Sequence, residues 1–151
     1  MTDRLKRVCR AFRIEGEWAS YEEISVGNIN HTYKVNFIQK DGRPKSYIVQ
    51  KVNTYVYKNP IQVMENIDRV TEHIRAKKPG QTALHFHHTI DRKIYFQDTD
   101  GFWRLFNYIP SDSCVDMDLD AIHNAGEAFG EFQMQLSDFD PAQLYETILN
   151  F

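Results

Sequence analysis

The chain has 151 residues, of which 42% are apolar and 26% charged. These are ordinary values for a globular domain with a real core, and they exclude a disordered chain. Its formal net charge of -3 argues against nucleic acid or an anionic membrane as a partner. Two cysteines, Cys9 and Cys114, make no disulfide framework, and no apolar run reaches membrane-spanning length, so we expect a cytoplasmic protein.

The N-terminal residues 3–13 predict a short amphipathic helix. Basic residues separate apolar side chains that recur at helical spacing: Leu5, Val8, Cys9 and Phe12. A basic amphipathic helix can also bind a membrane or calmodulin, but this one is short, so we place it at the edge of the domain. A loop is expected over residues 15–20.

Three strands are expected between Ile24 and Val52. A turn at residues 26–28 separates the first two strands, and a turn at residues 41–44 separates the second from the third. A glycine-bearing hairpin followed by a strand that carries Lys51 is an arrangement that covers nucleotide phosphates and holds them with a cation. Turn chemistry alone also explains a glycine in a hairpin.

The next element is a helix that begins at Pro60, after Asn59 as cap, and stops before Pro79 and Gly80. Its apolar stripe is suited to lie on the sheet and contains Met64, Ile67, Val70, Thr71 and Ile74. Acidic residues flank the stripe at positions 65, 68 and 72. One of these carboxylates could reach Lys51, although all three could equally be solvated surface groups.

Residues 83–109 predict a meander of three strands with turns at Asp91 and Gly101. His85 and His87 share one face of the first strand, and a metal there would need a third ligand that the sequence does not supply. We interpret them as strand histidines near the surface. A hinge is expected at residues 110–113, followed by a helix over residues 119–136.

The order of these elements and several stretches resemble a known superfamily. The stretches are GNINHTYKV, YIVQKVNTYVYKNPIQVMENIDRVTEHI, WRLFNYIPSDS, AGEAFGEFQMQLSDF and LYETILNF. They resemble the aminoglycoside phosphotransferase and choline kinase superfamily, and within it the N-acetylhexosamine 1-kinase group, whose members phosphorylate a sugar at its anomeric hydroxyl. The resemblance implies an α+β fold: a protein-kinase-like N-terminal lobe over residues 1–109, with an antiparallel sheet of about five strands and one packed helix. Residues 110–151 would then be the hinge and the first helix of a C-terminal lobe.

The resemblance also implies a site for ATP. Gly27 and Asn28 would lie in the nucleotide-positioning loop, and Lys51 would contact the phosphates. Gln50 competes with Lys51 for this role, because neighbouring strand residues point to opposite faces and only one can point inward.

The helix and the hinge would complete this ATP site. Glu65 would be the helix carboxylate that pairs with the lysine, with Glu72 as the alternative. Backbone groups of the hinge, Asn107 and Ile109 among them, would hydrogen-bond adenine.

One departure from the family limits the expected activity. A phosphotransferase of this type needs a catalytic aspartate in a His-x-Asp-like loop, an asparagine and an acidic metal ligand, and this sequence has no match at the required spacing. We therefore expect no catalytic residue or metal ligand here, weak ATP binding, and a lobe truncated before the part that would hold Mg²⁺. The alternative is a non-catalytic interaction module.

The helix over residues 119–136 is also expected to mediate assembly. Its bulky apolar side chains have no obvious partner within the chain: Leu119, Ile122, Phe129, Phe132 and Leu136. Burying each such side chain is worth about 1.5–3 kcal/mol. We expect a homodimer through this helix, with a monomer whose helix folds back onto the sheet as the alternative.

Overall fold

A computed structural model of the chain describes residues 1–25, 27, 29–77, 84–110 and 118–148. Its elements, in chain order, are α1 (Thr2–Ala11), β1 (Glu17–Ile24), β2 (His31–Ile38), β3 (Pro44–Val52), α2 (Pro60–Lys77), β4 (Phe96–Asp98), β5 (Gly101–Asn107), α3 (Leu119–Gln135) and the 3-10 turn η1 (Pro141–Gln143). The fold class is α+β, as the sequence predicts.

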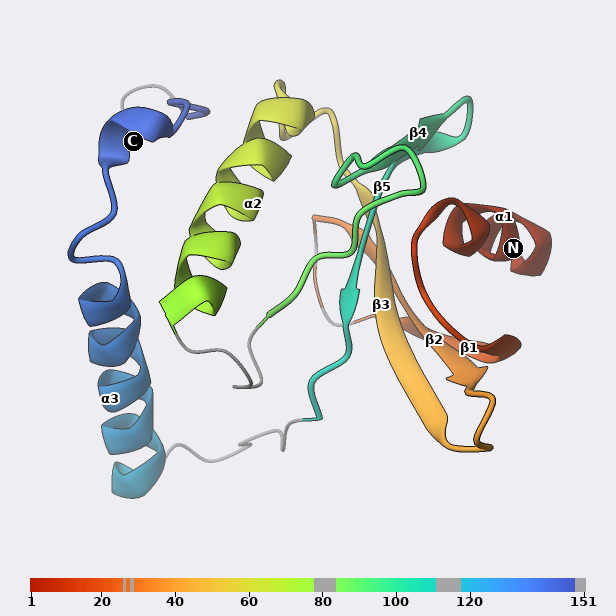
Figure 1. Cartoon of the computed structure of the whole chain (residues 1–151), viewed down its shortest axis with the longest axis horizontal. Helices are drawn as coiled ribbons and strands as arrows, with labels where there is room; N and C mark the ends of the chain where they lie inside the picture. The colour runs from red at the N-terminus through yellow and green to blue at the C-terminus, as the bar shows by residue number, and fades with distance from the viewer. Residues whose placement is uncertain (26, 28, 78–83, 111–117, 149–151) are drawn as a thin grey trace.

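The strands form one five-stranded antiparallel sheet in the order β1-β2-β3-β5-β4. The helix α2 lies between β3 and β4 in the sequence, so the chain leaves the sheet after β3 and returns at its far edge. This topology is consistent with the kinase-like N-terminal lobe that the sequence predicts. Figure 1 shows α1 and α2 on opposite sides of the sheet.

Strand alternation divides the sheet into an α1 face and an α2 face. The α1 face holds the larger core, in which side chains of the middle strands are almost fully buried: Tyr33, Val35, Phe37, Tyr47, Val49, Trp103 and Leu105. The α2 face holds a smaller cluster next to α2: Val52, Met64, Phe86, Ile94 and Phe102.

The helix α1 belongs to the main core. The expectation that it lies at the edge of the domain is therefore wrong. Leu5 and Val8 have no exposed surface, and Cys9 is buried beside them. Burial raises the pKa of the Cys9 thiol to about 12, so this thiol stays protonated at neutral pH. The short helix is stabilised by packing its apolar side chains against the sheet.

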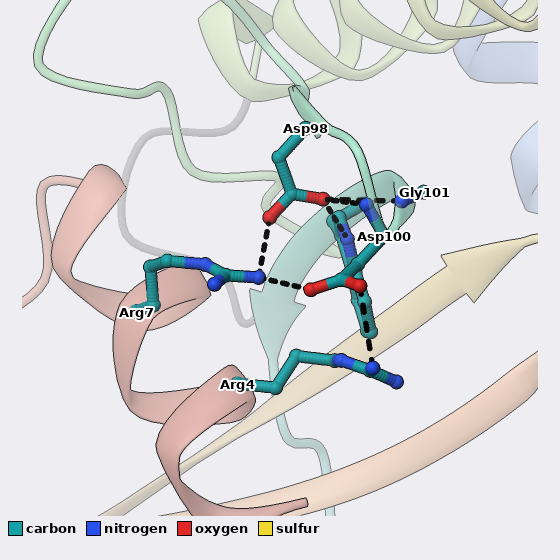
Figure 2. A network of polar contacts seen from close by, with 6 residues as sticks. Arg4, Arg7, Asp98, Asp100 and Gly101 are labelled. Carbon is teal, nitrogen blue, oxygen red and sulfur yellow. Dashed lines mark hydrogen bonds and ion pairs between the residues drawn. The ribbon is translucent and has the colours of Figure 1, made fainter.

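Two arginines of α1 also hold the turn between β4 and β5 (Figure 2). Arg7 pairs with Asp98 at 2.9 Å and with Asp100, and Arg4 lies 3.3 Å from Asp100. Asp98 in turn accepts hydrogen bonds from the backbone amides of Asp100 and Gly101. The turn is therefore fixed from both sides, by its own backbone and by α1.

The helix α2 has the expected start and ends at Lys77, but it is less buried than its stripe suggests. Met64 is its buried residue, while Ile67, Val70 and Ile74 are half-buried. Thr71 donates its hydroxyl hydrogen to the carbonyl of Ile67 one turn earlier. The helix therefore packs on the sheet mainly through its N-terminal half.

Two predicted boundaries differ from the structure. The expected loop over residues 15–20 is wrong, because β1 begins at Glu17; an irregularity between Trp18 and Ser20 interrupts the strand alternation there. The expected strand over residues 83–90 is reduced to isolated bridges. Its residues 85–87 bond to β5, whereas Ile90 donates to the carbonyl of Ala11, so the segment crosses from one partner to another.

The helix α3 lies beyond α2 on the side away from the sheet (Figure 1) and buries none of its residues. The helix α3 therefore does not fold back onto the sheet, which was the expected alternative. Polar contacts attach the segment after α3 to α2: Lys77 binds Asp138, and Asn66 exchanges two hydrogen bonds with the backbone of Tyr145. Among the described residues, no helix is both long and apolar enough to cross a membrane.

Candidate functional site

The α2 face of the sheet is polar where α2 does not cover it. Side chains from four neighbouring strands lie on this side, and we call them the polar face: Ser20, Glu22, Thr32, Lys34, Asn36, Ser46, Gln50 and Arg104. Antiparallel register sets them in rows, so that Gln50 is opposite Thr32 on one side and Arg104 on the other. A row of polar groups across a sheet is a surface that can bind a polar ligand.

Hydrogen bonds connect these side chains across the strands. Gln50 donates from Nε2 to Thr32 Oγ1 at 3.0 Å and accepts from Arg104 Nε at 2.8 Å. Further along the same strands, Ser46 donates to Asn36 Oδ1 at 2.7 Å. Each bond fixes a side-chain orientation, so the face is ordered without a ligand.

Two cations lie on this face. Lys34 is 3.8 Å from the carboxylate of Glu22, whereas the neighbours of Arg104 are neutral. Its guanidinium contacts Gln50, lies 3.9 Å from Met64 Sδ and sits 5.6 Å from the centre of the Phe86 ring. In the part of the chain that the structure describes, no carboxylate pairs with it. Burial lowers the pKa of Arg104, because the charged form loses hydration that nothing in its shell replaces fully. An anionic ligand would supply the missing charge.

Lys51, the expected phosphate cation, lies on the opposite face of the sheet. Its register partners are His31 and Trp103, and its ammonium sits 5.9 Å from the centre of the Trp103 ring. A Cβ added to Gly101 would come 2.5 Å from Lys51 Cε, so the glycine leaves room for the lysine stem. Of the two alternatives, Gln50 is therefore the residue that faces α2.

The expected ion pair between Glu65 and Lys51 does not form. Glu65 pairs with Arg69 one turn along α2 at 3.8 Å, and the alternative, Glu72, pairs with Arg75 at 2.7 Å. Both acids therefore form ion pairs within α2. The residue that α2 presents to the polar face is Met64, which contacts Arg104. The reason is strand parity, which puts Lys51 on the face that α1 covers.

The turn between β1 and β2 lies at the end of these strands. Gly27 adopts a φ of 139°, which only glycine takes up readily, and no neighbouring atom would meet a Cβ there. Asn28 lies outside the described residues. A contact that the sequence did not reveal holds the turn: Asn30 Oδ1 accepts a hydrogen bond of 2.9 Å from the backbone amide of Asn53, just after β3.

The segment after β5, expected as the hinge, has its first amides already engaged. Asn107 donates its backbone N–H to the carbonyl of His85, and Tyr108 donates its own to the carbonyl of Ser46. The side chain of Asn107 points to the α1 face, where its Oδ1 lies 2.7 Å from His87 Nε2. Ile109 is 40% exposed, and its amide has no partner among the described residues.

The histidines do not form a metal site within the described ranges. No group of three or more His, Cys, Asp or Glu side chains there is placed to hold a metal ion. His85 accepts from Arg75, His87 binds Asn107, and His88 lies 3.3 Å from Asp68. Each of the three rings therefore contacts a polar side chain of a neighbouring segment.

Sequence reasoning missed Arg104, and a signal for it existed. In the stretch FWRLFN, this arginine stands between Trp103 and Leu105, two fully buried residues of the other face. The two apolar neighbours indicate a strand in the interior of the sheet. An arginine in such a strand is not an ordinary surface residue. No protein-family model matches the chain.

Proposed function

We propose that this chain is the nucleotide-binding lobe of an ATP-dependent phosphotransferase that acts on a small molecule. The stretches quoted above resemble N-acetylhexosamine 1-kinases, and a sugar is therefore the acceptor class we propose. The observation that carries the proposal is Arg104, a cation with a neutral shell in the middle of the polar face.

Arg104 has the properties of a phosphate-binding group. A guanidinium presents several donors in a fixed plane, and hydrogen bonds from it to phosphate are charge-assisted. Its Nε is occupied by Gln50, and Nη1 has only a weak sulfur acceptor, so the guanidinium can still donate to a phosphate oxygen. In our proposal Arg104 takes the place that the sequence analysis gave to Lys51, and Gln50 orients it.

The neighbouring elements have matching parts in this proposal. The turn at Gly27 lies at the end of β1 and β2 and can approach a phosphate closely, because it has no side chain there. The amide and carbonyl of Ile109 are the backbone groups that we assign to adenine. The proposal covers nucleotide binding only, since phosphoryl transfer needs a catalytic aspartate and Mg²⁺ ligands that have no match in this sequence.

The test is to measure the binding of a non-hydrolysable ATP analogue by calorimetry and by changes in backbone chemical shifts. We expect weak binding, with shifts at Gly27, Gln50, Arg104 and Ile109. Arg104→Met should lower the affinity at least about tenfold, the loss of one charge-assisted contact. Lys51→Met is the matched control. It removes a cation from the neighbouring position of β3, on the opposite face of the sheet, and should leave the affinity for the ATP analogue unchanged.

Two outcomes would contradict this assignment. If Lys51→Met abolishes binding and Arg104→Met does not, the phosphates are on the α1 face and the role of Arg104 is lost. If the wild-type chain binds no adenine nucleotide at millimolar concentration, the nucleotide proposal itself fails. Turnover of ATP with N-acetylhexosamines is not expected from this chain.

A second candidate function, self-association through α3, is favoured by a separate observation. Large apolar side chains of α3 are exposed: Leu119 84%, Ile122 49%, Phe129 67% and Phe132 45%. An exposed patch of this kind commonly marks an interface. We propose that a second copy of this chain covers it, in a two-fold arrangement in which the same face of α3 meets itself.

Light scattering over a range of concentrations tests the dimer. Phe129→Asp should dissociate it, because a carboxylate would be buried against apolar side chains. Glu127→Lys, also on α3 and exposed, serves as the control and should leave the dimer intact. A wild-type chain that stays monomeric at the highest concentration reached would refute the proposal.

A further inference from the structure

A pocket of about 480 Å³ beside the last turn of α2 is lined entirely by basic side chains. They are Arg13, Arg75, His85, His87, His88 and Arg92. They come from the connection after α1, the last turn of α2, the crossing segment after it, and the turn before β4. None of them belongs to the polar face, so this pocket is separate from the proposed nucleotide site.

The pocket has more positive charge than its acidic neighbours offset. Glu72 is paired with Arg75 at 2.7 Å, and Asp68 lies 3.3 Å from His88. Arg13 donates to the backbone carbonyl of Ile90, a neutral group. In the described part of the chain no carboxylate pairs with Arg13 or Arg92. Two guanidinium groups at one pocket therefore lack an anionic partner.

The hydrogen bonds of two imidazoles determine which of their nitrogens carry a hydrogen. Arg75 is a donor only, so its contact of 3.0 Å with His85 Nδ1 makes that nitrogen the acceptor and leaves the proton on Nε2. His87 uses Nε2 for Asn107, which leaves Nδ1 to change from acceptor to donor when the ring is protonated. The two rings are 4.7 Å apart, so an anion beside them would favour protonation of both.

We propose that this basic pocket binds a small phosphate-bearing anion, held by Arg13 and Arg92 and by the imidazoles of His85 and His87. Arginine is the side chain best suited to phosphate, because its planar donors match two phosphate oxygens. The volume fits a ligand the size of pyrophosphate or a sugar phosphate. Both carry a phosphate group, and that group is what the pocket recognises.

Binding should strengthen as the pH falls. Burial lowers the pKa of His85, and so do the charges of His87 and Arg75, while Glu72 opposes them. Burial also lowers the pKa of His87; Lys45 and His88 add to this, and hydrogen bonds to Asn107 and the Arg13 backbone oppose it. Both rings are therefore neutral at neutral pH and gain charge below it, which adds attraction for an anion.

Calorimetric titration of the full chain with pyrophosphate, at about pH 6 and about pH 8, tests the site. We expect tighter binding at the lower pH, and at least an about tenfold loss of affinity in the double variant Arg13→Gln/Arg92→Gln. The control Arg10→Gln/Arg43→Gln also removes two exposed arginines, neither of which lines the pocket, and should bind like the wild type. Equal losses in both double variants would overturn the proposal, as would no binding at the lower pH.

Imidazole NMR provides a second readout that does not depend on a variant that folds. Pyrophosphate should raise the pKa of His85 and His87, the two imidazoles that we assign to the anion. Unchanged titration of the two pocket histidines would overturn the proposal. If a sugar phosphate binds as tightly as pyrophosphate, the phosphate group alone is sufficient for binding. If the sugar phosphate binds more tightly, the rest of the pocket contacts the sugar. Arg13→Gln/Arg92→Gln should leave the affinity for the ATP analogue intact, which separates this site from the nucleotide proposal.

Discussion

The two faces of one sheet have opposite chemistry in this protein. On the α1 face, aromatic and aliphatic side chains of β2, β3 and β5 pack against a helix and lose nearly all exposure. On the α2 face, the helix covers one end only, and the rest is the polar face around Arg104. One face therefore supplies most of the stability, and this allows the other to carry a desolvated cation that stabilises nothing by itself.

The largest effect is expected from a deletion on the α1 face. Trp103 has no exposed surface, and Trp103→Ala should lower the free energy of unfolding by about 3–5 kcal/mol, since it removes apolar contacts and leaves a cavity. Thr32→Ala on the polar face is the comparison. It removes one half-buried hydrogen bond and should cost about 1 kcal/mol. Urea denaturation measures both. Similar losses of unfolding free energy in the two variants would show that the two faces contribute equally to stability.

A substitution at Arg104 should separate stability from function. Arg104→Met replaces a desolvated cation by an apolar side chain of similar length, so unfolding should change by less than about 1 kcal/mol, or the protein should become more stable. Nucleotide affinity should fall in the same variant. A loss of several kcal/mol in the urea midpoint analysis would mean that Arg104 holds the fold, and the contrast between the faces would break down.

Acid should destabilise the fold through the histidines next to the α1 face. The pKa of His85 and His87 is lowered in the folded state, so the unfolded chain binds more protons as the pH falls below about 6.5. The free energy of unfolding should therefore decrease over this range. The variant His85→Gln/His87→Gln should show a flatter profile between about pH 7 and about pH 5.

A second acid range lies lower and belongs to carboxylates. Hydrogen bonds from Lys77 and His73 lower the pKa of Asp138 to about 2, and Arg7 lowers that of Asp100. Their contribution is present above about pH 4 and is lost as the pH falls through the lowered values. A profile with a single transition below about pH 4 would show that the histidine groups do not contribute.

The smallest effect is expected from the ion pairs between α1 and the β4–β5 turn. Arg7→Gln removes the contacts with Asp98 and Asp100 that Figure 2 shows. Because these side chains are partly exposed, the thermal midpoint should fall only slightly. The difference from wild type should shrink in high salt, which screens exposed charges. A difference that persists at high salt would show that Arg7 acts through packing of its stem.

Local sequence patterns determined several elements without help from the fold. Asn59 and Pro60 marked the start of α2, and strand alternation gave β2 and β3, because capping and side-chain periodicity are properties of neighbouring residues. They did not give β1 or the crossing segment after α2. An irregularity masks the alternation of β1, and the crossing segment takes its hydrogen bonds from two distant partners.

Tertiary packing alone decided which residues reach the candidate site. The sequence showed that Gln50 and Lys51 point to opposite faces, but it could not say which face is which. Alternation fixes only the relative orientation of neighbours. The absolute orientation depends on which side of the sheet α1 and α2 pack, and the pattern within β3 does not encode this. Once α1 covers the side of Lys51, the other side belongs to Gln50 and Arg104, and this single choice by the fold defines the site.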